Sequence, residues 1–156
     1  MIDHRRWQRN RMTSHLAKSM VLWLGASILS GFAASFAFVF FGGVIWMIAG
    51  LHNGLATAVM DGLVTITLLL YLSPIVLGCF LLGSLVFGPP AFLLLRRLGR
   101  SGPVASACAG GFFAGLAALA FLGVFGPLAV APIPLAGAVG GWMFRAVVED
   151  IPKQLA

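Results

Sequence analysis

Three long stretches of the chain carry no charged residue. Residues 19–51, 62–95 and 101–144 contain no Asp, Glu, Lys or Arg. About 20 apolar residues in a helix cross the ~30 Å hydrocarbon core of a bilayer, and each stretch is longer than that. The pattern therefore predicts an all-α integral membrane protein.

Turn-forming residues divide these stretches into four spans. The turns are expected at His52-Asn53-Gly54 and between Gly126-Pro127 and Pro132-Ile133-Pro134, with a basic loop around residue 100. The predicted spans are about residues 20–48, 66–88, 103–125 and 134–148. They form one transmembrane domain, residues 19–148, between polar tails at 1–18 and 149–156.

Prolines interrupt the second uncharged stretch. Proline removes a helical hydrogen bond, so we expect a kink at Pro74 and an end to the span near Pro89-Pro90, followed by a short interfacial turn over residues 91–98. Two separate crossings at residues 55–71 and 74–95 are the alternative. They would place Arg96 on the side opposite the basic N-terminus, which the positive-inside rule opposes.

The positive charges fix the predicted orientation. All ten Lys and Arg residues lie in the tails, the central loop or the last helical end, and the two other loops have none. They are Arg5, Arg6, Arg9, Arg11 and Lys18, then Arg96, Arg97 and Arg100, and finally Arg145 and Lys153. Four spans arranged as two hairpins, with both termini cytoplasmic, put all ten on one side. Trp142 and Arg145 mark the cytoplasmic end of the last span.

Composition excludes a soluble domain. The chain is 60% hydrophobic and 9% charged, against roughly 25% charged residues in soluble domains. The net charge of +6 lies beside apolar spans, so anionic lipid headgroups are the expected partner and nucleic acid is not. The excess of Arg over Lys, with abundant Ala, Gly and Leu, is typical of GC-rich bacterial genomes and suggests a bacterial cytoplasmic membrane. The basic tail is interpreted as a topology signal, or alternatively as an amphipathic helix that docks a partner.

Asp61 is the one acidic residue outside the tails, and it has two interpretations. Thr57, Asp61 and Thr65 are four residues apart, so a helix would place them on one face. The carboxylate either caps the start of the second span or forms a cation or proton site at its outer mouth. His52 lies in the same loop, but two candidate ligands are too few for a zinc site.

Small residues at four-residue spacing predict close helix packing. Gly111 and Gly115, like Gly137 and Gly141, form GxxxG motifs, and Ser27, Gly31 and Ser35 repeat the spacing in the first span. Lipid offers helices no hydrophobic reason to associate, so small faces that let backbones approach drive their packing. We expect the third and fourth spans to form a close pair.

The sequence holds no enzyme signature. It lacks a nucleophile elbow, HExxH, CxxC and a phosphate-binding loop, so no catalytic residue, metal or cofactor is predicted. The resulting hypothesis is a non-enzymatic subunit or accessory that associates with another membrane protein, or with itself, through small-residue helix faces. The alternative is a small oligomeric transporter or channel with Asp61 at its outer entrance.

Overall fold

The computed structural model of the protein describes residues 4–100 and 102–150, and this part of the chain is helical with no strand. In chain order the elements are α1 (His4–Gly50), the 3-10 turn η1 (Leu51–Asn53), α2 (Leu55–Tyr71), α3 (Ser73–Arg97), α4 (Pro103–Phe125), α5 (Pro127–Val130), α6 (Pro132–Arg145) and the π-helical turn η2 (Ala146–Asp150).

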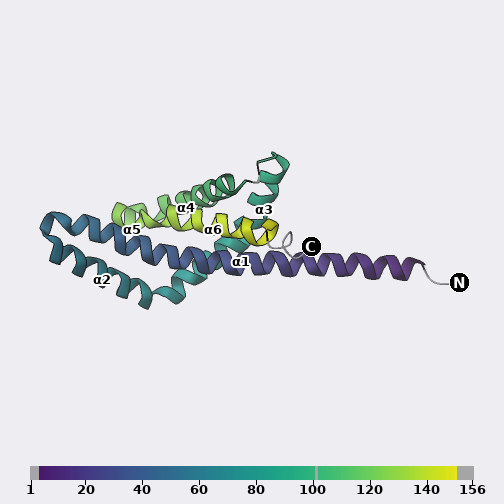
Figure 1. Cartoon of the computed structure of the whole chain (residues 1–156), viewed down its shortest axis with the longest axis horizontal. Coiled ribbons are helices and arrows are strands. Elements are labelled where there is room, and N and C mark those ends of the chain that lie inside the picture. Colours follow the sequence, from purple (N-terminus) through teal and green to yellow (C-terminus); the bar gives the residue numbers. More distant parts are fainter. Residues whose placement is uncertain (1–3, 101, 151–156) are drawn as a thin grey trace.

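Within the described residues, four segments are long and apolar enough to cross a membrane, which defines an integral membrane protein, as predicted. They are Met20–Asn53, Ser73–Arg97, Pro103–Ala120 and Pro127–Glu149. Helix α1 is longer than a bilayer requires: its 47 residues extend roughly 70 Å at 1.5 Å per residue. Its N-terminal part continues the first span as one helix and projects from the bundle (Figure 1).

Helices α2 and α3 return along α1 as one bent path. Ile66 of α2 packs on Gly43, and Leu81 of α3 packs on Gly31, so both helices run antiparallel to α1. The path bends at Leu72, between the two helices. Pro74 lies at the start of α3, where its missing N–H costs no hydrogen bond; inside a continuous helix it would clash with the preceding turn. The kink expected at Pro74 therefore lies two residues earlier, where the helix is interrupted at Leu72.

The helix does not end at Pro89-Pro90, where the sequence predicted an end. Helix α3 continues through both prolines to Arg97, so no separate interfacial turn forms over residues 91–98. Packing on both sides of the prolines accounts for the difference. Gly88 lies against the ring of Phe144, and Phe92 is almost fully buried. Neighbouring helices hold such proline-containing helices together in membranes.

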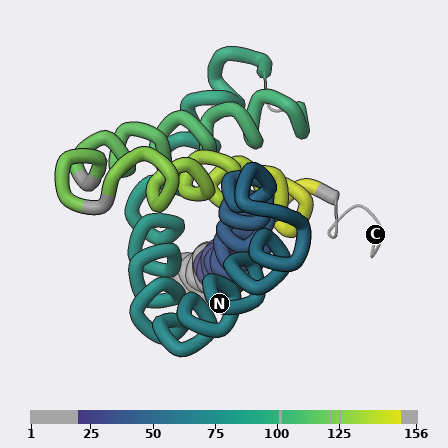
Figure 2. The backbone as a smooth tube through the Cα atoms, turned by 90° about the vertical axis from the view of Figure 1, so that its left-hand side faces the viewer, coloured from purple at the N-terminus to yellow at the C-terminus, as the bar shows by residue number. Residues whose placement is uncertain are grey.

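Helix α1 is the centre of the bundle. Figure 2 shows α2 and the first part of α3 on one side of α1 and α6 on the other, with α4 beyond α6. The C-terminal part of α3 passes α6 and reaches α4. The buried face of α1 consists of small residues, among them Ala26, Ser27, Ser30 and Ala34. Small side chains let three helices approach one helix closely, which is how membrane bundles gain packing energy.

An aromatic cluster joins α1, α3 and α6 near one end of the bundle. The ring centroids of Trp23 and Phe92 are 5.7 Å apart, those of Trp23 and Phe144 5.8 Å, and those of Phe92 and Phe144 6.0 Å. Edge-on and tilted aromatic pairs at such distances add about 0.5–1.5 kcal/mol each beyond area burial. The turn after α1 and the α5 region lie at the opposite end (Figure 1).

Candidate functional site

Asp61 is not a helix cap, so the capping interpretation drawn from the sequence is wrong. Helix α2 begins at Leu55, immediately after the His52-Asn53-Gly54 turn, and its N-cap is Gly54 without a side-chain cap. Asp61 lies in the second turn of the helix, beyond reach of the free N–H groups that a cap would accept from.

The half-buried Asp61 carboxylate lies against the end of α1. A Cβ built on Gly50 would come within 2.9 Å of Asp61 Oδ2 and 3.0 Å of Cα of Ala58, so a larger residue there would require the carboxylate to move. Among the described residues, no hydrogen bond or ion pair joins this carboxylate to another group. An unpaired acidic group beside the C-terminal end of a helix faces the negative end of the helix dipole, which is an unfavourable location.

The predicted polar stripe lies along the edge of the α1–α2 contact. Ala58 and Gly62 form the buried centre of that contact. Thr57 is exposed and donates a long hydrogen bond of 3.4 Å from Oγ1 to Asn53 O, while Thr65 is half-buried. The three polar side chains therefore share a side of α2 without bonding to one another.

His52 is engaged with the backbone instead of with Asp61. Its Nδ1 lies 2.6 Å from Ala49 O, where a protonated Nδ1 donates to the carbonyl oxygen. Within the described residues no three His, Cys, Asp or Glu side chains come together as metal ligands do. Cys79 and Cys108 are both free and exposed.

Helices α4 and α6 form the closest helix pair, through glycines in a different register from the predicted one. A Cβ built on Gly110 would collide with the carbonyl oxygen of Gly137 and lie 2.9 Å from Cα of Gly141. A Cβ on Gly141 would in turn collide with the carbonyl oxygen of Ser106. The α4 face at the contact is therefore Ser106, Gly110 and Ala114, small residues with the four-residue spacing of a GxxxG motif but only one glycine.

The two predicted glycines of α4 differ in how closely they approach α6. Gly111 is in tight contact with it, since a built Cβ would lie 3.2 Å from Pro134 O and 3.4 Å from Cβ of Ala138. Gly115 is at the edge, 3.8 Å from the Pro134 ring. Both glycines predicted in α6, Gly137 and Gly141, lie within the contact.

A small polar cluster links α1 to α3 near Gly31. Ser84 Oγ lies 2.7 Å from Ser27 O on α1 and 3.0 Å from Leu81 O in its own helix. Ser30 Oγ donates to the same Ser27 carbonyl at 3.0 Å. Leu81 packs directly on Gly31, where an added Cβ would lie 2.7 Å from its Cδ2. These contacts fix α3 against the first span.

The basic residues differ in their surroundings. Arg96, Arg97 and Arg100 are exposed, and none forms an ion pair with a described acidic side chain. Arg145 lies 3.3 Å from Glu149, one turn later. The side chains of Arg5, Arg6, Arg9 and Arg11 lie outside the described part of the structure.

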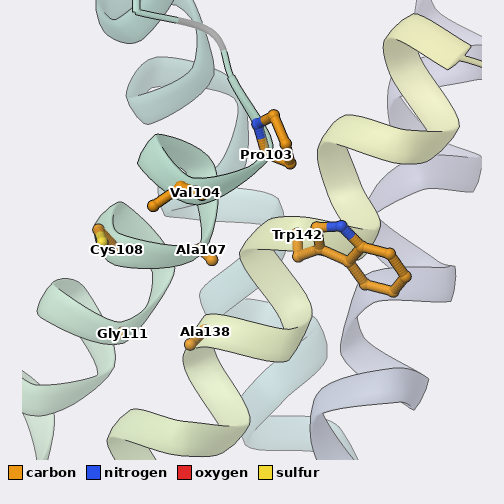
Figure 3. Close-up of a pocket in the computed structure, with 7 residues that line it drawn as sticks. All are labelled: Pro103, Val104, Ala107, Cys108, Gly111, Ala138 and Trp142. Carbon is orange, nitrogen blue, oxygen red and sulfur yellow. The ribbon is translucent and has the colours of Figure 1, made fainter.

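The grooves on the surface are apolar. One groove of about 380 Å³ runs between α4 and α6 and is lined by Pro103, Val104, Ala107, Cys108, Gly111, Ala138 and Trp142 (Figure 3). A second, of about 420 Å³, lies between α4 and the α5–α6 segment, near Leu119 and Val130. Neither groove is lined by an ionisable side chain other than the thiol of Cys108, so neither has the acid and base groups of a hydrolytic site.

In comparisons with known proteins, no family model matches the chain, and neither a curated protein nor a solved structure matches it.

Proposed function

We propose that this protein is a non-enzymatic subunit or accessory of a membrane assembly, which associates through the outer face of α3. In this proposal both termini and the basic loop are cytoplasmic, and the membrane is a bacterial cytoplasmic membrane. The observation that carries the proposal is the unpartnered face of α3. In the most apolar 18-residue stretch of α3 only 6% of the residues are buried, against 28% in that of α1.

The outer face of α3 has the composition of a helix-packing surface. Ile75, Leu82 and Val86 recur at helical spacing on the side opposite Leu81 and Ser84, and their exposed fractions are between 60% and 67%. Gly78 and Cys79 lie on the same side, and nothing lies within 4 Å of a Cβ built on Gly78. A small residue flanked by aliphatic side chains suits the close approach of a partner helix.

Cross-linking through the native Cys79 tests this proposal. Membranes that contain the protein are treated with a thiol oxidant or a short bis-maleimide, and adducts are separated by mass. We expect adducts through Cys79, lost in the Cys79→Ser variant and retained in Cys108→Ser. A chain that stays monomeric in mild detergent and forms no adduct would contradict the proposal.

The second candidate is a small oligomeric transporter or channel with Asp61 at its outer entrance. The observation that favours it is the half-buried Asp61 carboxylate, unpaired among the described residues and within a helix instead of at a cap. Ionisable groups beside membrane spans are costly and often functional. Proteoliposome ion flux in the parent protein that disappears in Asp61→Asn would favour this candidate over the first.

A further inference from the structure

We propose that the groove between α4 and α6 binds one anionic phospholipid, with an acyl chain in the groove and its phosphate at Arg96, Arg97 and Arg100. Arg100, the last arginine of this basic cluster, precedes Pro103 of the groove lining by three residues. The groove lies on α4 and α6 and is separate from the association face of α3, although Arg96 and Arg97 belong to the last turn of α3.

The dimensions of the groove match one acyl chain in one leaflet. From Pro103 to Gly111 the lining extends over eight helical steps of α4, roughly 12 Å. Half of the ~30 Å hydrocarbon core is of similar length. The lining is apolar throughout, with the Trp142 ring on its α6 side (Figure 3). Tryptophan is enriched at the headgroup level of membranes, so the Trp142 end of the groove is its mouth.

A defined turn fixes the backbone of the arginines just before α4 begins. Arg100 N–H donates to Leu95 O at 2.9 Å and Gly99 N–H donates to Arg96 O at 3.1 Å, with Gly99 at φ +65°. This is a Schellman motif, and it folds Arg100 back beside the last turn of α3, which carries Arg96 and Arg97. Arg100 precedes Pro103 by three residues, so their Cα atoms are within roughly 11 Å.

Charge complementarity selects an anionic lipid over other occupants. The three guanidinium groups are exposed and have no described acidic partner, so they present a concentrated positive charge at the membrane surface. A second protein helix in the groove would bring this charge into an interface, where an unpaired charge is costly. Phosphate accepts the fork of donors that each arginine offers.

Fluorescence quenching by brominated lipids tests the proposal. A variant with Trp142 as its only tryptophan is reconstituted in two lipid mixtures. One contains brominated phosphatidylglycerol in plain phosphatidylcholine, and the other contains plain phosphatidylglycerol in brominated phosphatidylcholine. A single-Trp46 variant reports on the opposite end of α1 and is the control. We expect the quenching of Trp142 to show that the groove binds phosphatidylglycerol at least about fivefold more strongly than phosphatidylcholine. One arginine near the membrane surface contributes about that factor. Trp46 should show no preference.

Two further variants and one control separate binding of the headgroup from binding of the acyl chain. Replacing all three arginines by Gln should abolish the anionic preference at Trp142 while leaving general quenching. Ala107→Leu fills the groove and should weaken quenching by both lipids, whereas Ala117→Leu on the exposed side of α4 should not. The proposal is overturned by equal quenching from both lipids, by a preference that survives in the Gln variant, or by quenching unaffected in Ala107→Leu. Absence of quenching at Trp142 would also overturn it, because protein would then cover the groove.

Discussion

Gly110 of α4 and Gly141 of α6 bring two helix backbones into direct contact. A Cβ built on Gly110 would lie 2.9 Å from Cα of Gly141, and one on Gly141 would lie 3.1 Å from Cα of Gly110. Backbone atoms cannot move aside as a flexible side chain can. The pairing of α4 with α6 therefore requires glycine at both positions, because only a hydrogen atom fits in place of a Cβ.

Gly110→Ala is accordingly expected to destabilise the bundle. Overpacking a tight contact costs about 1–3 kcal/mol. Gly115→Ala is the matched control on the same helix, because its added methyl meets only ordinary contact at 3.8 Å. The control should be neutral, or more stable by up to about 1 kcal/mol from helix propensity. Thermal unfolding in detergent measures both variants, and equal midpoints would contradict the assigned register.

The hydroxyl of Ser84 is expected to contribute to stability through its interhelical bond. Ser84→Ala removes the 2.7 Å contact to Ser27 O, and such bonds average about 0.6 kcal/mol in membrane bundles. Thr67 provides the comparison: its hydroxyl bonds only to Leu63 O in its own helix, at 2.9 Å. Thr67→Ala should leave the unfolding free energy nearly unchanged. A larger loss for Thr67→Ala than for Ser84→Ala would show that the α1–α3 bond is not formed.

Replacement of Asp61 should reveal its location inside α2. A capping residue would lose about 1 kcal/mol on substitution by Ala. Within the helix, Ala has a higher helix propensity than Asp. The substitution also removes a negative charge from the negative end of the α1 dipole. Asp61→Ala should therefore unfold at the same or a higher temperature than the parent. A clear drop in the unfolding temperature would restore the capping interpretation.

Thiol labelling tests the proposed orientation in the membrane. In a background without Cys79 and Cys108, Asn53→Cys should react with an impermeant thiol reagent added from outside intact cells. Leu98→Cys, in the exposed turn between the arginines, should react only after the membrane is opened. Both residues are exposed in the structure, so a difference reports the side of the membrane and not burial within the protein. Reversed labelling would show that the basic loop faces outward.

The amino-acid sequence by itself determined that the chain folds into long apolar helices that cross a membrane. Long uncharged stretches have no stable alternative in lipid, because the backbone must satisfy its own hydrogen bonds there. Predicted span 103–125 matches α4, Pro103–Phe125, because Gly102 and Gly126 end it on both sides.

The tertiary structure alone decided the helix faces and three local features. Each step along a helix turns the side chain by about 100°, so Gly110 and Gly111 point in very different directions. In a helix of a soluble protein, the apolar residues show which face is buried. Nearly every face of α4 is apolar, so only the shapes of the neighbouring helices determine that Gly110 lies in the contact. In the same way, packing of Gly88 and Phe92 on Phe144 carries α3 through its prolines, and the break at Leu72 lies ahead of Pro74. The early start of α2 at Leu55 places Asp61 inside the helix, where its carboxylate meets the end of α1.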